Sequence, residues 1–316
     1  MLKFFALLLS VITFSFSMPN IVQAAEKLEN LSITINIPSR MLTLYAKDKI
    51  IKEYRVGIGR SDHETPIGDF KIRSKELNPT WVKPIKEGEE KVVIEAGPDN
   101  PLGYRWMEFA DLYGIHGTNQ PESIGGYVSN GCVRMREKDV EELYDIVPLG
   151  TPVHITYERI IIKQRADKMV TLNIYPDEYA KGSVNMFDIN RKLAAYGVAG
   201  FVSDDAVSSK LEELNSETIE VAKTFFINIS GKVIKAVGVN CDGINYLPVV
   251  PIATERKMAV SWDANTQTLR SPFGTAPGYV RNDVLYINSD YAYALYGVYI
   301  KWNSATNTMH IDNSAD

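Results

Sequence analysis

The stretch LSITINIPSRMLTLYAKDKIIKEYRVGIG, residues 31–59, constrains the fold most, because apolar and polar residues alternate along most of it. Alternation with a period of two is typical of strands that bury one face. The segments Pro38-Ser39-Arg40 and Ala46-Lys47-Asp48-Lys49 interrupt the pattern. We therefore expect three short strands arranged as a meander.

The sequence up to residue 157 continues to indicate short strands. A Pro-Gly turn precedes a strand in ETPIGDFKI, residues 64–72, and further strands are expected at 104–109, 113–116 and 153–157. One clear helix is expected in EKDVEELYDIV, where apolar residues recur at helical spacing and Pro148 follows. Residues 31–157 are thus predicted to form a mostly β domain with one main helix.

The remainder of the chain is predicted to contain two further parts. Residues 158–222 read as a linker and helical segment, with one helix starting at Met186 and a second over 206–222. Residues 223–316 contain a weak repeat whose two copies each read as a helix, a strand with a Trp, a turn and a returning strand. A smaller α+β repeat domain is expected there. Trp262 and Trp302 are expected to pack in its core, and a sugar-stacking platform stays open as the alternative.

The N-terminus has the composition of a targeting segment. Lys3 precedes an apolar run, and small residues around Ala24 suit a cleavage site. The run is shorter than the roughly 20 residues of a membrane-spanning helix. Residues 1–24 are therefore predicted to be a signal peptide that places the protein outside the cytoplasm, with an uncleaved anchor as the alternative. The net charge of −5 comes from interspersed charges, which argues against a nucleic-acid partner.

The loop IHGTNQPESIGGYVSNGCVRM carries the side chains most suited to catalysis. It begins at Ile115 and joins His116 to Cys132, one of only two cysteines in the chain. A thiol reacts as its thiolate and needs a base or a positive environment, which His116 and Arg134 could supply. The amides of Gly131 and Cys132 could form an oxyanion hole.

Other interpretations of these residues remain open from composition and spacing alone. Cys132 and His116 could be a buried cysteine and a hydrogen-bonded core histidine. Cys132 could also form a disulfide with Cys241, because an exported chain meets an oxidising environment. The histidines His63, His154 and His310 are isolated in the sequence, so no metal site is expected.

A family resemblance favours the catalytic interpretation. HGTNQPESIGGYVSNGCVRM resembles the signature of the L,D-transpeptidase (YkuD-type) catalytic domain, which is His-Gly-Thr, a Gly-containing loop and Ser-(His)-Gly-Cys-(Ile/Val)-Arg-Met. TPIGDFKI, NPTW and LGTPVHI are similar to further segments of that family. The resemblance covers residues 31–157 and implies a β-sandwich-like catalytic domain.

The resemblance implies a role for each matching residue. Cys132 would be the nucleophile, His116 the general base, and the Gly117 carbonyl would orient the imidazole. Asn130 departs from the pattern, because many members have His at that position. The other positions implied in substrate or oxyanion binding are Gly131, Arg134, Ser129 and Trp81.

The implied activity is that of an exported peptidoglycan L,D-transpeptidase that joins stem peptides by 3→3 cross-links. Carboxypeptidase activity of the same site and a catalytically degenerate wall-binding protein are the alternatives. No cofactor is expected, the partners would be peptidoglycan stem peptides, and the protein would be a monomer. The C-terminal part weakly resembles stalk-like modules named after the N-terminal domain of copper amine oxidases, which implies spacing or wall attachment and no copper.

Overall fold

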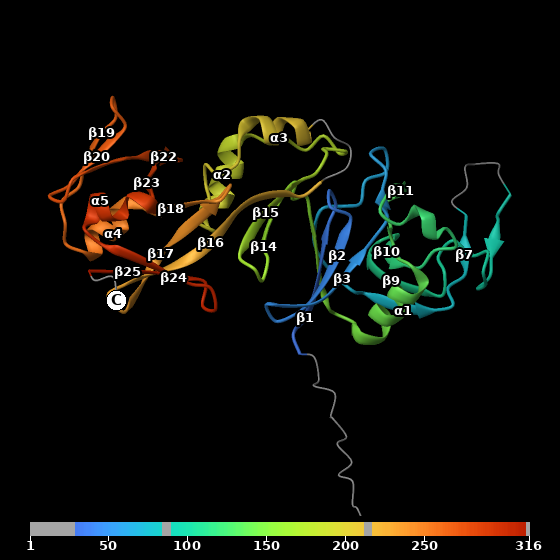
Figure 1. Ribbon diagram of the computed structural model, residues 1–316. Helices are drawn as coiled ribbons and strands as arrows, with labels where there is room; N and C mark the ends of the chain where they lie inside the picture. The colour runs from blue at the N-terminus through green and yellow to red at the C-terminus, as the bar shows by residue number, and fades with distance from the viewer. Residues whose placement is uncertain (1–28, 84–89, 212–216, 314–316) are drawn as a thin grey trace, which may run out of the picture.

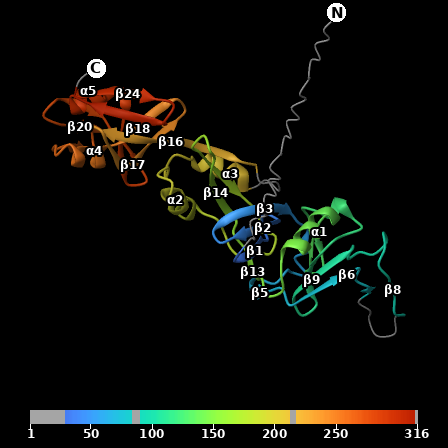
Figure 2. The same cartoon turned by 90° about the horizontal axis from the view of Figure 1, so that it is seen from below.

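A computed structural model of the chain describes residues 29–83, 90–211 and 217–313. The predicted signal peptide, residues 1–24, lies outside them. Strands dominate the structure, which confirms the predicted mostly β fold class. Figure 1 shows two lobes, with the N-terminal half in blue to green and the C-terminal half in yellow to red. The view from below in Figure 2 shows the same lobes end to end in an elongated molecule.

Two main sheets build the N-terminal lobe. One has the strand order β3-β2-β1-β13-β5 and the other β12-β10-β9-β6. Two short pairs, β11 with β4 and β7 with β8, complete the lobe. The strands are β1 Leu31–Asn36, β2 Met41–Ala46, β3 Lys49–Arg55, β4 Ile58–Gly59, β5 Gly68–Lys71, β6 Ser74–Leu77, β7 Trp81–Val82, β8 Val93–Ile94, β9 Arg105–Ala110, β10 Tyr113–His116, β11 Tyr127–Ser129, β12 Val133–Arg134 and β13 Pro152–Thr156.

A single apolar core lies between the two main sheets. Ile33 and Ile35 of β1 and Met107 and Phe109 of β9 belong to the same buried cluster. Because both sheets contribute to it, the lobe has the sandwich-like character that the family resemblance implied. The alternation of residues 31–59 indeed produces the β1–β2–β3 meander, in which Leu42 and Leu44 face this core.

The predicted main helix is α1, Glu137–Ile146. Val140 and Leu143 are buried on its apolar side, and Val147 follows the helix into the core. Glu137 and Asp139 lie in its first turn, where carboxylates interact favourably with the helix dipole.

A larger sheet organises the C-terminal half. Its main path is β14-β15-β16-β17-β18-β23-β22, and β25 joins it beside β16 and pairs with β24. A separate small sheet has the order β19-β20-β21. The strands are β14 Ile160–Gln164, β15 Met169–Ile174, β16 Ile219–Ile229, β17 Lys232–Cys241, β18 Ile244–Pro248, β19 Ser261–Asp263, β20 Thr268–Arg270, β21 Thr275–Pro277, β22 Tyr279–Arg281, β23 Val284–Asn288, β24 Tyr299–Asn303 and β25 Thr308–Asp312.

The helix predicted over 206–222 is wrong in its extent. The helix α3, Asp204–Leu211, ends early, and Ile219 already begins strand β16. The residues IEVAKTFFINI of β16 are rich in β-branched and aromatic side chains, which favour strands, and they lie between β15 and β17 in the large sheet. The helix predicted to start at Met186 is present as α2, Met186–Ala194.

The C-terminal repeat is visible in the backbone. The first copy has helix α4, Val249–Glu255, and the hairpin β19–β20; the second has α5, Ala292–Tyr296, and the hairpin β24–β25. The two hairpin turns are capped alike, because Asp263 Oδ1 accepts from the amides of Asn265 and Thr266, and Asn303 Oδ1 accepts from those of Ala305 and Thr306.

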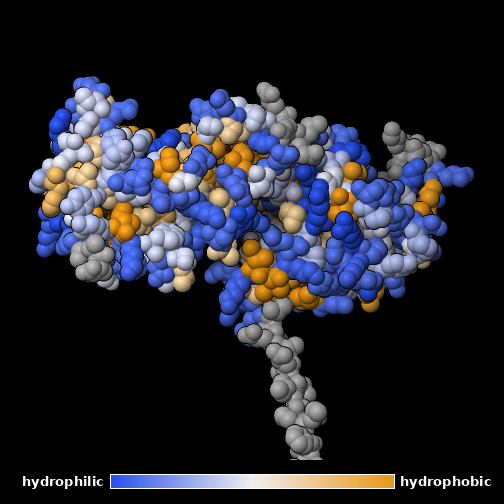
Figure 3. Space-filling view, in the orientation of Figure 1, coloured by the Kyte–Doolittle hydropathy of each residue, from blue (hydrophilic) through white to orange (hydrophobic). Residues whose placement is uncertain are grey.

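The two tryptophans of the repeat have different surroundings. Trp262 is half-buried against the core of the C-terminal half, as expected. Trp302 is 47% exposed and meets Phe225 edge-on, with 5.4 Å between the ring centroids. Figure 3 shows hydrophobic residues in small groups among hydrophilic ones on this face of the molecule. In the described residues, no helix is both long and apolar enough to cross a membrane.

Candidate active site

The register between two parallel strands brings the predicted base and nucleophile to one face of a sheet. In the pairing of β10 with β12, Ile115 lies opposite Val133 and His116 opposite Arg134. Side chains alternate along a strand, so His116 and Arg134 project to one face, and Cys132, two residues before Arg134, is placed to project to the same face. Ile115 and Val133 point the other way and are fully buried in the core.

These side chains line a cavity of about 550 Å³ on the N-terminal lobe. Its volume lies within the usual range of small-molecule sites. Six of the eight residues predicted at the site are among its lining residues, while Gly131 and Gly117 lie in the loops that support it. The lining consists of Thr80, Trp81, Val82, Pro101, Leu102, Trp106, Glu108, Leu112, Tyr113, His116, Ser129, Asn130, Cys132 and Arg134.

His116 is buried and held in one orientation. The Gly117 carbonyl oxygen accepts a hydrogen bond from His116 Nδ1–H over 2.6 Å, which leaves Nε2 as the basic nitrogen. Trp106 stacks on the imidazole, with 5.7 Å between the ring centroids and 24° between the planes. Burial lowers the pKa of His116 from 6.5 to about 4, although the Gly117 carbonyl acts in the opposite direction. The imidazole is therefore neutral at pH 7 and can accept a proton.

Cys132 is a free thiol, and so is Cys241. The alternative of a disulfide between them is therefore wrong. Cys132 Sγ–H donates to the Leu112 carbonyl oxygen over 3.5 Å. Burial raises the pKa of the Cys132 thiol, while the Gly114 amide and the positive charge of Arg134 act to lower it. The predicted effect of Arg134 has the expected sign, but desolvation outweighs it, so a neutral thiol and a neutral imidazole line the same cavity in the resting structure.

The loop before Cys132 is shaped by Gly131 and Ser129. Gly131 has φ +106°, and a Cβ there would lie 2.4 Å from the ring of Tyr113. Ser129 Oγ donates to the Cys132 carbonyl oxygen over 2.6 Å and accepts from the Gly131 amide over 3.1 Å. The Gly131 amide predicted for an oxyanion hole is thus already engaged in the resting structure.

Gly117 is required for a close approach on the other side of His116. A Cβ at Gly117 would lie 1.9 Å from Glu137 Oε1. The Glu137 carboxylate accepts from the amides of Thr118, over 2.6 Å, and Tyr104, over 3.1 Å. The start of helix α1 therefore braces the backbone that carries the Gly117 carbonyl.

The remaining predicted residues form the rim of the cavity. Arg134 donates from Nη1 to Gln120 over 3.3 Å, and its buried Nε has no partner within the described part of the chain. Asn130 is exposed, and Trp81 of β7 is half-exposed. The positive charge of an arginine close to the thiol suits a carboxylate group of a ligand.

Sequence reasoning missed eight of the fourteen lining residues, which are Thr80, Val82, Pro101, Leu102, Trp106, Glu108, Leu112 and Tyr113. Trp106 and Glu108 lie on β9 opposite His116 and Gly114 respectively. The alternation in RWMEFA buries Met107 and Phe109 and sends Trp106 and Glu108 to the other face. That alternation was the available signal, although it does not say which strand β9 would pair with.

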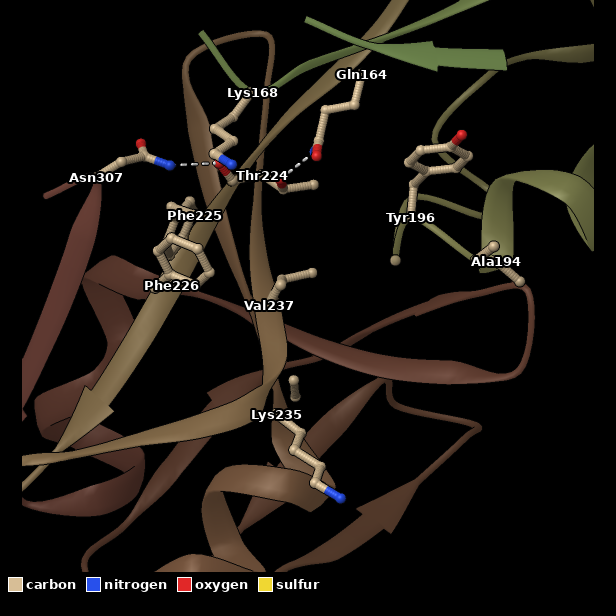
Figure 4. Close-up of a pocket in the computed structure, with 13 residues that line it drawn as sticks. Gln164, Lys168, Ala194, Tyr196, Thr224, Phe225, Phe226, Lys235, Val237 and Asn307 are labelled. Atoms are coloured by element: carbon tan, nitrogen blue, oxygen red, sulfur yellow. Dashed lines mark hydrogen bonds between the residues drawn. The ribbon is translucent and has the colours of Figure 1, made fainter. Parts of the chain in front are cut away.

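A second cavity, of about 350 Å³, lies in the C-terminal half (Figure 4). Part of its polar lining is paired internally, because Gln164 donates to Thr224 Oγ1 and Asn307 donates to the Thr224 carbonyl oxygen, each over 2.8 Å. No cysteine or histidine lines it. In residues 29–83, 90–211 and 217–313, no group of three or more His, Cys, Asp or Glu side chains is placed to hold a metal ion.

Because the imidazole of His116 is buried, we expect the free energy of unfolding to fall in acid. The unfolded chain binds a proton at its histidine near pH 6.5, whereas folded His116 resists protonation down to a pKa of about 4. The stability due to neutral His116 is therefore complete above pH 6.5 and is lost between pH 6.5 and 4, by about 3 kcal/mol. Urea unfolding at pH 7, 5.5 and 4 measures this loss.

The variant His116→Gln isolates this contribution from the carboxylates that titrate in the same range. Its free energy of unfolding should fall less on acidification than that of the wild type. His154→Gln is the matched control, because His154 is 45% exposed and pairs with Asp69. Identical pH dependence in the wild type and His116→Gln would contradict the buried neutral imidazole.

Comparison with known proteins agrees with this site. The YkuD family model, described as the L,D-transpeptidase catalytic domain, matches residues 30–155. YqjB of Bacillus subtilis strain 168, named as an L,D-transpeptidase, is 38% identical over 145 residues, which are 42% of this chain and 78% of YqjB. The chain belongs to the L,D-transpeptidase family. The predicted L,D-transpeptidase catalytic domain is thereby confirmed.

A further relative and a solved structure match a similar share of the chain. YbiS of Escherichia coli K12, also named as an L,D-transpeptidase, is 37% identical over 138 residues, which are 40% of this chain and 45% of YbiS. An L,D-transpeptidase structure from Mycobacterium smegmatis aligns with a TM-score of 0.34 and 17% identity, covering 40% of this chain and 58% of that one. The family model ends at residue 155, so the resemblance of the C-terminal repeat to a stalk-like module stays a prediction.

Proposed function

We propose that the protein is an exported peptidoglycan L,D-transpeptidase that forms 3→3 cross-links through a thioester on Cys132. The observation that carries this proposal is the parallel register of β10 with β12, which directs His116 and Cys132 into one cavity. Family membership of residues 30–155 supports the same reaction.

The first half of the reaction acylates Cys132. His116 Nε2 takes the thiol proton as the sulfur attacks the carbonyl carbon of the third residue of a tetrapeptide stem. The proton then passes from His116 to the amine of the terminal D-Ala, which leaves as the C–N bond breaks. Arg134 would hold a carboxylate of the stem near the thiol, and a backbone amide at Cys132 would stabilise the oxyanion.

The second half returns the enzyme to its resting state. An amine on a neighbouring stem loses a proton to His116 and attacks the thioester carbonyl, which forms the cross-link and releases the sulfur. The sulfur recovers its proton from His116. Water in place of the amine would give carboxypeptidase activity. Because the imidazole is neutral in the free enzyme, it can act as base at the start of both halves.

The other parts of the chain would serve this reaction at the wall. Residues 1–24 would export the protein and be removed, and residues 223–316 would space or attach the catalytic domain. The partners would be peptidoglycan stem peptides, with the protein acting as a monomer.

Product analysis of purified disaccharide-tetrapeptide by mass spectrometry tests the proposal. We expect a cross-linked dimer that has lost one D-Ala. Tripeptide without dimer would indicate the carboxypeptidase alternative. Binding to peptidoglycan without turnover would indicate the degenerate wall-binding alternative, which only Asn130 favours.

A further inference from the structure

A segment well outside the family-matched region is built into the catalytic lobe. Tyr179 lies beyond β15 in the sequence, yet it is 4% exposed and belongs to the core cluster shared by β1 and β9. Its ring stacks on Tyr157, at 5.6 Å between centroids, and meets Tyr127 edge-on at 6.0 Å. The family model stops at residue 155 and does not include it.

The segment 177–182 has a fixed local shape. Its own Asp177 carboxylate accepts from the amides of Lys181, over 2.9 Å, and Gly182, over 3.0 Å. Tyr157 Oη donates to Asp177 over 2.8 Å and accepts from the Tyr179 amide over 2.9 Å. The Tyr179 hydroxyl is therefore held at a defined place.

That hydroxyl forms hydrogen bonds at both ends of the turn Gly59–Thr65, which leads from β4 into the ETPIGDF motif. Tyr179 Oη donates to the Gly59 carbonyl oxygen over 2.7 Å and accepts from the Thr65 amide over 3.1 Å. Thr65 is fully buried, and its Oγ1 accepts from the Gly59 amide over 2.9 Å. Lys181 forms an ion pair with Glu64 of the same turn, over 2.8 Å.

The Gly59–Thr65 turn also contacts the loop that carries the proposed nucleophile, Cys132. Gly59 lies opposite Ser129 in the pairing of β4 with β11, and the Arg60 amide donates to the Ser129 carbonyl oxygen over 3.1 Å. A Cβ on Gly131 would lie 3.1 Å from the Glu64 carbonyl oxygen, so the turn packs directly on that loop.

We propose that Tyr179 is a positioning residue for catalysis, which fixes the Gly59–Thr65 turn and through it the backbone of Ser129–Cys132. The start of the ETPIGDF motif thus binds the segment 177–182, which lies beyond the catalytic domain and is called the strap below. The proposal rests on the function proposed above, since it assigns Tyr179 to the same acyl transfer.

Tyr179→Phe tests the strap, because it keeps the ring and removes both hydrogen bonds. We expect kcat for acyl transfer to fall about tenfold or more, with KM for the donor stem within twofold, since misplacing a reacting group by a fraction of an ångström is costly. Tyr196→Phe is the matched control, because its hydroxyl donates to the Ile162 carbonyl oxygen in the other lobe. It should leave kcat unchanged.

Alkylation of Cys132 by iodoacetamide, in a Cys241→Ser background, gives a readout that does not need the proposed activity. Burial raises the pKa of this thiol, so a loosened loop should expose it and move the alkylation midpoint to lower pH. Faster alkylation together with slower acyl transfer is the expected signature. A change in unfolding temperature alone, with wild-type kcat and alkylation profile, would overturn the proposal.

Lys181→Gln provides a second variant should Tyr179→Phe fail to fold. It breaks a half-exposed ion pair at the far side of the turn and should shift both readouts in the same direction by less. Wild-type values for Lys181→Gln in that case would refute the strap. If the wild type makes no cross-links, the proposed function fails, while the alkylation profiles still decide whether Tyr179 positions Cys132.

Discussion

Cys132→Ser should make no cross-linked muropeptide and form no covalent adduct with the donor stem. A serine hydroxyl is far less acidic than a thiol, and the neutral imidazole of His116 is too weak a base to ionise it in advance. Loss of a nucleophile at such a site lowers kcat by about 10⁴-fold or more. Mass spectrometry of the intact protein after incubation with donor stem measures the adduct directly.

Cys241→Ser is the matched control for this prediction, because it makes the same change at the other free thiol. Cys241 ends strand β17, where its Sγ–H donates to the Val221 carbonyl oxygen over 3.7 Å, and it does not line the catalytic cavity. Its adduct and cross-linking rate should match the wild type. An adduct that persists in Cys132→Ser would place the nucleophile elsewhere.

The outline of the site could be predicted because its two central residues are close in sequence. His116 and Cys132 lie at the ends of one loop, and the strands that carry them pair with each other. Their proposed roles rest on the loop and its family signature. The alternating pattern of residues 31–59 likewise determined a local meander, since β1, β2 and β3 pair in sequence order.

Contacts between distant segments left no comparable signal. Tyr179 is separated from Gly59 by 120 residues, and nothing in its own neighbourhood distinguishes it from other loop tyrosines. The direction in which the pKa of Cys132 shifts could not be predicted from the sequence either. The sequence places Arg134 nearby and so predicts the direction of its effect, but the burial that outweighs it comes from the folded cavity.

The overextended helix prediction has a different cause. Residues 206–222 contain enough Leu, Glu and Lys to satisfy a helical pattern, and β16 begins inside that window. Propensity is a weak guide where a segment can gain a full set of inter-strand hydrogen bonds, and β16 pairs with β15, β17 and β25. The sheet partners decide the outcome, and they come from elsewhere in the chain.

His116→Gln should lower kcat/KM for acylation about 10²- to 10⁴-fold at pH 7, the usual range for a lost general base. Glutamine keeps a side chain of similar size and polarity but cannot take the thiol proton. Rates of adduct formation across pH 3–10 provide the measurement, with His154→Gln as the control at an exposed strand position.

The shape of the pH profile distinguishes a base from a merely structural histidine. In the wild type, kcat/KM should rise through the pKa of His116, about 4, and then level off, because the neutral imidazole removes the proton. In His116→Gln the thiol must ionise unaided, and its pKa is raised by burial. The variant should therefore become about tenfold faster with each pH unit up to that pKa and approach the wild type only in alkali. A variant that is uniformly slower, with an unchanged profile, would mean that His116 only supports the fold.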